Sequence, residues 1–229
     1  MKFLYNILIA LASFFSSSCT SHATNLDSTK YPIQGIDISH HQGVIDWKSL
    51  KQEAKVQFVF MKATEGGNFK DTKFQYNWKA AKEIGIRRGA YHFYSFCKAG
   101  AEQAANFISS VPIDKNALPP VVDLEFLGSC KKRPPVQEAI KEIQIFLDLL
   151  EKQYGKPPIL YTTYAFYEVY LKEDLTSYDL WLRDIQKEPI LENRNWKFWQ
   201  FSNRGTRKGI KGNVDLNVFY GNIQSFNQY

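Results

Sequence analysis

The segment Pro119-Pro120-Val121-Val122-Asp123-Leu124-Glu125-Phe126 combines a short apolar run with two acidic residues. Val121 and Val122 predict a buried strand. Residues two apart in a strand point to the same face, so we expect Asp123 and Glu125 to lie side by side at its C-terminal end. In a parallel β/α barrel that end forms the rim on which catalytic groups sit. The segment therefore predicts a barrel strand that carries two rim carboxylates.

The chain around this segment alternates short apolar runs with longer amphipathic ones, which predicts strands and helices in turn. The expected strands are Gln34–Ser39, Phe58–Ala63, Arg88–Tyr94, Val121–Phe126, Ile159–Thr163, Leu180–Arg183, Lys197–Phe201 and Asn217–Tyr220. The expected helices are Asp46–Lys55, Thr72–Ile84, Ala99–Ser110, Pro135–Tyr154 and a shorter Ala165–Leu171. This alternation implies parallel strands joined by right-handed crossovers.

The second half of the chain breaks the alternation, because three strands crowd into residues 180–220 with too little chain between them for ordinary helices. Eight strands can still close a barrel, but its outer ring of helices is then incomplete on one side. We therefore expect an α/β fold in the form of a lopsided β/α barrel. An open doubly wound sheet is the alternative, and the sequence lacks the glycine-rich phosphate loop that would favour it.

Two further acidic residues belong to the predicted rim. Asp37 ends the first strand and Asp215 lies beside the last, and these strands are neighbours if the barrel closes. Crowded carboxylates cannot all ionise easily, so the pKa of one rises and it becomes a proton donor beside a charged partner. Glycoside hydrolysis uses such a pair. A capping role or a surface ion pair would explain an isolated Asp123 and Glu125, but four acids at one mouth indicate an active site.

No other chemistry competes well in this sequence. His40 and His41 follow Asp37, but no H-E-x-x-H or C-x-x-C spacing indicates a metal site, and no cofactor is expected. His92 lies in an aromatic strand and is expected to be a hydrogen-bonded core residue. There is no G-x-S-x-G elbow, and Cys97 lacks a cysteine-protease context.

Aromatic side chains near the predicted strand ends offer faces on which sugar rings can stack. Tyr161 and Trp181, near the rim ends of two late strands, are the main candidates. The other aromatic candidates, some of which must belong to the core, are Tyr91, Phe93, Tyr164 and Trp199.

The N-terminus has the pattern of an export signal. Lys2 precedes an apolar run, Phe3–Phe15, that is too short for a comfortable membrane span. Small residues and Cys19 follow, so residues 1–19 resemble a bacterial lipoprotein signal with Cys19 as the lipidated residue. Ordinary cleavage nearby, giving a secreted protein, is the alternative. Residues 20–31 are small and polar and are expected to form a tether before a catalytic domain at 32–229.

Export would place Cys97 and Cys130 in an oxidising environment, where a disulfide is plausible; two reduced thiols are the alternative. The formal net charge of +6 is modest, and the basic residues are scattered. Nucleic acid is therefore not an expected partner, whereas an anionic wall polymer is compatible with this charge. We expect a monomer.

A series of segments carries a further signal. In chain order they are Gly35–Gly43 with Ile45–Trp47, Phe60–Gly66, Gly89–Tyr94, Val121–Glu125, Trp199–Ser202 and Gly209–Phe219. Together they resemble glycoside hydrolase family 25, the Chalaropsis-type lysozymes that cleave peptidoglycan between N-acetylmuramic acid and N-acetylglucosamine. The resemblance covers nearly all of residues 33–220.

The resemblance implies a modified TIM-like barrel with five helical crossovers and three further strands. It implies Glu125 as the general acid and Asp123 as the group that positions or stabilises the N-acetyl group or the intermediate. Asp37 and Asp215 would complete the acidic cluster. At its border would lie Lys62 and Glu65. Substrate assistance is favoured over a carboxylate nucleophile, because Asp123 and Glu125 come from one strand and do not flank a bond.

The sequence departs from the family at two places. Arg183 and Asp184 stand where members usually carry smaller or aromatic residues, and the loops with Cys97 and Cys130 look particular to this chain. A chitinase-like hydrolase is the second enzyme hypothesis, but its longer acidic motif is missing. A wall-binding protein without catalysis is the third, and the presence of all four acids argues against it.

Overall fold

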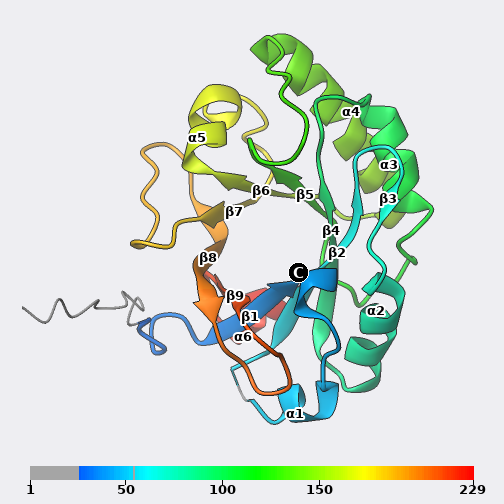
Figure 1. Cartoon of the computed structure of the whole chain (residues 1–229). Helices are drawn as coiled ribbons and strands as arrows, with labels where there is room; N and C mark the ends of the chain where they lie inside the picture. The colour runs from blue at the N-terminus through cyan, green and yellow to red at the C-terminus, as the bar shows by residue number, and fades with distance from the viewer. Residues whose placement is uncertain (1–25, 54) are drawn as a thin grey trace, which may run out of the picture.

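The computed structural model describes residues 26–53 and 55–229 (Figure 1). The predicted signal segment, with Cys19, lies outside the described residues. The end of the predicted tether instead packs on the domain, because Tyr31 is buried and its ring lies 5.7 Å from that of Trp199. Over the described part of the chain, no helix is both long and apolar enough to cross a membrane.

Eight strands close into a barrel, which confirms the predicted fold class. Neighbouring strands around the ring follow the order β1, β2, β4, β5, β6, β7, β8, β9, and β9 pairs back with β1. Their bounds are Ile33–Ile38 (β1), Phe58–Glu65 (β2), Arg87–Phe93 (β4), Val121–Leu124 (β5), Ile159–Thr163 (β6), Leu180–Arg183 (β7), Trp196–Gly205 (β8) and Val214–Phe219 (β9). A two-residue strand, β3 (Phe69–Lys70), extends β2 as a short hairpin.

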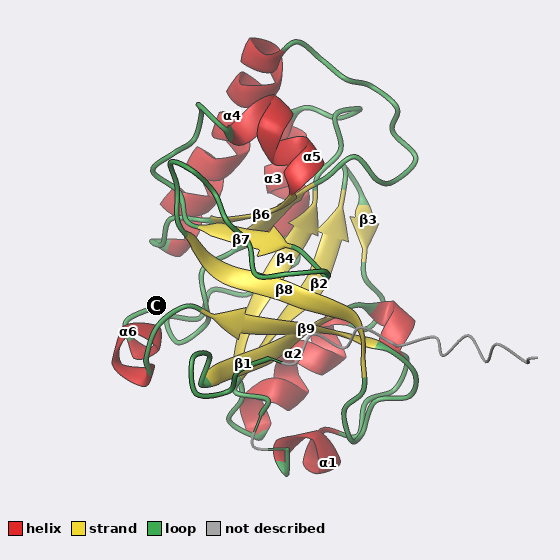
Figure 2. Cartoon of the chain, turned by 90° about the vertical axis from the view of Figure 1, so that its left-hand side faces the viewer, coloured by secondary structure: helices red, strands yellow, loops and turns green. Residues whose placement is uncertain are grey.

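Helical segments occupy the five connections from β1 to β7, as the resemblance implies. They are α1 (Trp47–Lys51), α2 (Phe74–Glu83), α3 (Gly100–Ile108), α4 (Val136–Tyr154) and α5 (Tyr164–Phe166), which continues into a π-helical segment, Tyr167–Leu171. Helices α2, α3 and α4 cover the side of β2, β4 and β5, whereas Figure 2 shows β8 and β9 without a helix in front of them. The ring is incomplete on the predicted side.

The last strand, β9, runs antiparallel to both β8 and β1. Only residues 206–213 join β8 to β9, and a parallel crossover needs a dozen or more residues, so the chain has to turn back. Asp215 consequently lies near the start of β9, directly opposite Asp37 in the pairing with β1. The antiparallel direction therefore brings the acid to the same rim as the C-terminal ends of the parallel strands.

The barrel interior below the rim is filled by aromatic side chains. Phe58 and Phe60 point inward from β2, and their rings lie against the backbone of the neighbouring strands β1 and β4. This is possible because Gly35 on β1 and Gly89 on β4 carry no side chain. A Cβ on either glycine would come within 2.5 Å of these rings. Helix α6 (Ile223–Asn227) closes the opposite end, with Phe226 fully buried against Phe58. The rim pocket thus has a rigid apolar floor.

Candidate active site

The site arises from the alternation of side chains along each barrel strand. On β2, Phe58 and Phe60 fill the interior and the next inward residue, Lys62, reaches the rim. On β5, Val121 lies in the interior core and Asp123 is the next residue on that face. The inward faces of β2 and β5 therefore change from apolar to polar residues as these strands approach the rim.

A pocket of about 640 Å³ opens at this rim. All four predicted acids line it, together with the predicted binding residues Lys62, Tyr91, Phe93, Tyr161 and Trp181. The pocket also has residues to which the sequence analysis gave no role: Ile38, Ser39, His41, Gln42, Leu127, Arg183, Gln200 and Asn203. Glu65 is outside the lining and lies at its border, where its Oε2 accepts a hydrogen bond from Lys62 Nζ at 2.6 Å.

Asp37 and Asp215 form a hydrogen-bonded acid pair across β1 and β9. The Oδ2 atom of Asp37 also accepts hydrogen bonds from Gln200 Nε2 at 2.9 Å and Asn217 Nδ2 at 2.8 Å. Burial and the charge of Asp37 raise the pKa of Asp215 to about 8. Burial also raises the pKa of Asp37, but the hydrogen bonds from Asn217, Gln200 and Asp215 oppose this shift, so Asp215 is the donor of the pair and Asp37 the acceptor.

Asp123 and Glu125 occupy different environments on the same face. Asp123 is 7% exposed, and its pKa is well above the usual range because of burial and the nearby charge of Glu125. Within the described residues its buried Oδ1 atom accepts no hydrogen bond. Glu125 is half-buried, and burial raises its pKa to about 7 although Arg183 and Lys62 act in the opposite direction. Glu125 can thus hold a proton near neutrality and release it.

Lys62 is held in place between the acids and the aromatic wall. Besides its bond to Glu65, the ammonium group lies 4.9 Å from the centre of the Phe93 ring and 5.3 Å from that of Phe69. A cation over an aromatic face is attracted by the ring's quadrupole. These contacts fix a positive charge at the border of the pocket.

The structure gives Tyr161 and Trp181 a place different from the stacking faces predicted for them. Trp181 is 1% exposed and its ring lies against Phe60, with 4.7 Å between centroids. Its Nε1 donates to Asn217 Oδ1 at 2.8 Å, and Tyr161 Oη donates to Gln200 Oε1 at 3.0 Å. Each bond occupies an amide oxygen and turns the amide NH₂ toward Asp37. Both rings belong to the pocket floor and orient the acid pair.

The sequence analysis missed Gln200, which lines the pocket, and Asn217, which is fully buried and donates to Asp37. Asn217 follows Asp215 by two positions on one strand and so faces the same side, a signal that was available. Gln200 stands inside the Trp199–Ser202 match, but an amide in an aromatic strand does not by itself indicate a site. Of the other predicted aromatics, Tyr164 and Trp199 lie outside this pocket.

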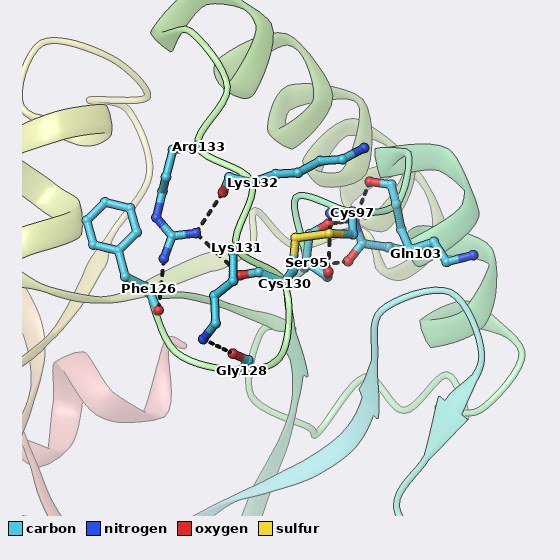
Figure 3. The surroundings of a disulfide bond; sticks show 10 residues. Ser95, Cys97, Gln103, Phe126, Gly128, Cys130, Lys131, Lys132 and Arg133 are labelled. Atoms are coloured by element: carbon cyan, nitrogen blue, oxygen red, sulfur yellow. Dashed lines mark hydrogen bonds between the residues drawn. A yellow bond between two sulfur atoms is a disulfide. The ribbon is translucent and has the colours of Figure 1, made fainter.

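Cys97 and Cys130 are joined by a disulfide that ties the loop after β4 to the loop after β5 (Figure 3). The second loop begins next to Glu125. It is also held by Arg133, whose Nη2 donates to the carbonyl oxygen of Phe126 at 3.1 Å (Figure 3). The crosslink therefore restrains the segment that carries one of the four acids.

His92 is fully buried on the outer side of β4, where its ring nitrogens contact Thr64 Oγ1 at 2.7 Å and Gln103 Oε1 at 3.1 Å. Burial lowers its pKa to about 4, so it is neutral and part of the core, as expected. Across residues 26–53 and 55–229, no three His, Cys, Asp or Glu side chains are grouped so as to hold a metal ion.

Comparison with known proteins agrees with this geometry. The family model "Glycosyl hydrolases family 25" matches residues 36–210. A family 25 glycosyl hydrolase from Bacillus anthracis is 42% identical, with a TM-score of 0.85 over 92% of this chain and 99% of its own. The uncharacterized protein YegX of Escherichia coli K12 is 35% identical over 87% of this chain and 74% of its own. Lysozyme M1 of Streptomyces globisporus is 32% identical over 82% of this chain and 68% of its own.

Proposed function

The chain belongs to family 25 of the glycosyl hydrolases, and from this premise we propose that it is a muramidase. Its substrate would be the β-1,4 bond between N-acetylmuramic acid and N-acetylglucosamine in peptidoglycan. The convergence of Asp37, Asp123, Glu125 and Asp215 in one pocket is the observation that carries the proposal. The names of the relatives point the same way, since they include Lysozyme M1.

Glu125 is proposed as the general acid. A proton donor for the leaving glycosidic oxygen works best when its pKa lies near the operating pH. Burial raises the pKa of Glu125 to about 7, whereas Asp37 and Asp215 already share a proton with each other. Glu125 is also less deeply buried than Asp123, so a substrate oxygen in the pocket can reach it.

Asp123 is proposed to act on the substrate's acetamido group. The free Oδ1 atom suits an acetamido N–H, which would supply the hydrogen bond that the protein does not. The acetamido oxygen then attacks the anomeric carbon as the glycosidic C–O bond breaks and Glu125 protonates the leaving oxygen. Water opens the resulting ring, gives its proton to Glu125, and restores the acetamido group.

Asp37, which also lines the pocket, is proposed to support this step electrostatically. Its anionic carboxylate is fixed by Gln200 and Asn217, and it lies close enough to Glu125 to raise the pKa of that group. The same negative charge favours the oxocarbenium-like transition state.

One digestion tests the proposed reaction. Purified peptidoglycan is treated with the protein, the products are reduced with borohydride, and the new alditol is identified. Muramitol is the expected product; glucosaminitol, or no release, would refute a muramidase. Glu125→Gln should fold normally and lose turnover by at least about 100-fold.

A second substrate separates assistance from a carboxylate nucleophile. Glycan strands whose muramic acid has been N-deacetylated lack the attacking oxygen. Under substrate assistance they should be cleaved at least about 100-fold more slowly, by analogy with loss of a well-placed reacting group. Equal rates on acetylated and deacetylated strands would instead favour a protein nucleophile.

We also propose that the protein acts outside the cytoplasm, either as a lipoprotein anchored through Cys19 or as a secreted protein. Peptidoglycan is an extracytoplasmic substrate, and the Cys97–Cys130 disulfide suits an oxidising compartment. Expression with radiolabelled palmitate, followed by comparison with Cys19→Ser, distinguishes the two forms.

A further inference from the structure

A second pocket of about 540 Å³ adjoins the catalytic one on the side of β7. The two pockets share one lining residue, Arg183, which ends β7. The remaining lining includes Thr163, Ala165, Asp184, Lys187 and Ile190. They come from the ends of β6 and β7 and from the segments that follow, so the pocket extends the rim rather than a separate face of the molecule.

Arg183 is the unusual group in this arrangement. Arg183 is half-buried, and among the described residues its guanidinium has neither a hydrogen-bond partner nor a carboxylate at ion-pair distance. Its charge nevertheless reaches Glu125, Asp37 and Asp215, whose pKa values it lowers. A guanidinium offers five N–H donors in a fixed fork that matches a carboxylate. All of them remain available to a ligand.

The second pocket favours an anionic ligand with a short apolar body. Lys187 adds a second cation, and Asp184 is turned away into the loop, where its Oδ1 accepts the backbone N–H groups of Gln186 and Lys187 at 2.8 and 3.1 Å. Ile190, which is 78% exposed, and Ala165 both line the pocket and give it an apolar part. The two cations and this apolar part together suit a carboxylate carried on a short aliphatic group.

We propose that Arg183 and this second pocket form a subsite for the carboxylate-bearing lactyl ether substituent of the muramic acid sugar, with or without its stem peptide. The inference rests on the proposed muramidase function and specifies which part of the substrate the β7 side recognises. The carboxylate has two sources: the free lactyl group of a peptide-free strand, or a carboxylate of the attached stem peptide. Arg183 binds it through paired N–H donors, which makes Arg183 a specificity-determining residue.

Four substrates separate the sources. They are peptide-bearing strands with a free glutamate α-carboxylate, the same strands with that carboxylate amidated, amidase-stripped strands with a free lactyl carboxylate, and stripped strands whose lactyl group is amidated. KM and kcat are measured on each by release of reducing ends. Arg183→Gln should raise KM about tenfold or more on the carboxylate-bearing substrate and leave KM on its neutral counterpart unchanged.

The pattern identifies the source. A KM effect confined to stripped acidic strands assigns the lactyl carboxylate; an effect confined to acidic stems assigns the peptide. Arg183→Lys should recover part of the lost affinity, since it restores the charge without the fork. Ala165→Trp narrows only the second pocket, and it should raise KM for peptide-bearing substrates if the peptide lies there. Arg204→Gln is the matched control, because Arg204 is exposed and lines neither pocket.

Two results would overturn the inference while leaving the proposed function intact. One is an equal loss on acidic and amidated substrates, which would mean that Arg183 acts only through the catalytic carboxylates. The other is an Arg183→Gln enzyme with unchanged KM on all four. Absence of muramitol release by the unaltered protein would overturn the proposed function and this inference together.

Discussion

Glu125→Gln should stabilise the protein at alkaline pH and have almost no effect on stability at acid pH. In the folded protein the pKa of Glu125 is about 7, against 4.5 for an unperturbed glutamate. Between these values the folded state keeps a proton that the unfolded state has released. Stability therefore falls as the pH rises from about 4.5 to about 7, and the full loss is present above that range.

The size of the effect follows from the difference between the two pKa values. At about 1.36 kcal/mol per pH unit, the shift from 4.5 to about 7 corresponds to about 3 kcal/mol of lost stability. The main cause is burial of the carboxylate, with Asp37 adding to it and Arg183 opposing it. A glutamine at this position has no charge to bury. For a domain of this size the substitution should raise Tm by roughly 6 to 12 °C near pH 8.

Calorimetry near pH 4 and near pH 8 measures the difference in Tm between Glu125→Gln and the unaltered protein at each pH. Glu151→Gln, on the exposed face of α4, is the matched control and should change Tm little at either pH. The reasoning is refuted if Glu125→Gln lowers Tm near pH 8, or if it shifts Tm equally at both pH values. The first outcome would mean that the ionised carboxylate has a stabilising partner.

Three further outcomes are expected. Turnover should fall as the pH rises past about 7, where Glu125 loses its proton; a rate profile that stays level to about pH 9 would contradict its role as acid. The Cys97→Ser, Cys130→Ser double variant opens a crosslink of 33 residues and should lose about 4 kcal/mol of unfolding free energy in urea, whereas an unchanged midpoint would show that the crosslink constrains little. Trp181→Phe removes the donor to Asn217 and should lower kcat more than it raises KM; kcat equal to that of the unaltered enzyme would mean that the amide needs no such orientation.

Much of the barrel could be predicted from the sequence. Each strand corresponds to a short apolar run, and each connection between the strands of the first half of the chain is long enough for a helix. The acids could be predicted for the same reason, since Asp37 and Asp123 stand where their strands end. The direction of β9 could not be predicted, because the expected strand bounds left residues 202–216 between the last two strands, which is enough for a parallel crossover. Only the observed bounds shorten this connection to residues 206–213.

The roles of Tyr161 and Trp181 could not be read from their positions along the strands. Both lie near the rim ends of β6 and β7, which is compatible with an open sugar-binding face. Whether such a ring is exposed depends on what fills the interior at the same height, and here Phe60 from β2 covers the Trp181 ring. That contact joins residues more than 100 positions apart, and no local pattern encodes it.

The cations of the pocket explain how four carboxylates can share one rim. Lys62 forms an ion pair with Glu65, so its charge is partly neutralised at the border of the pocket. Arg183 is the half-buried cation that acts on Glu125, Asp37 and Asp215 without forming a close pair with any of them. Substrate binding at Arg183 would neutralise it and raise the pKa values of these acids. A carboxylate on the substrate would therefore help keep Glu125 protonated, and the group that recognises the substrate would also tune the acid that cleaves it.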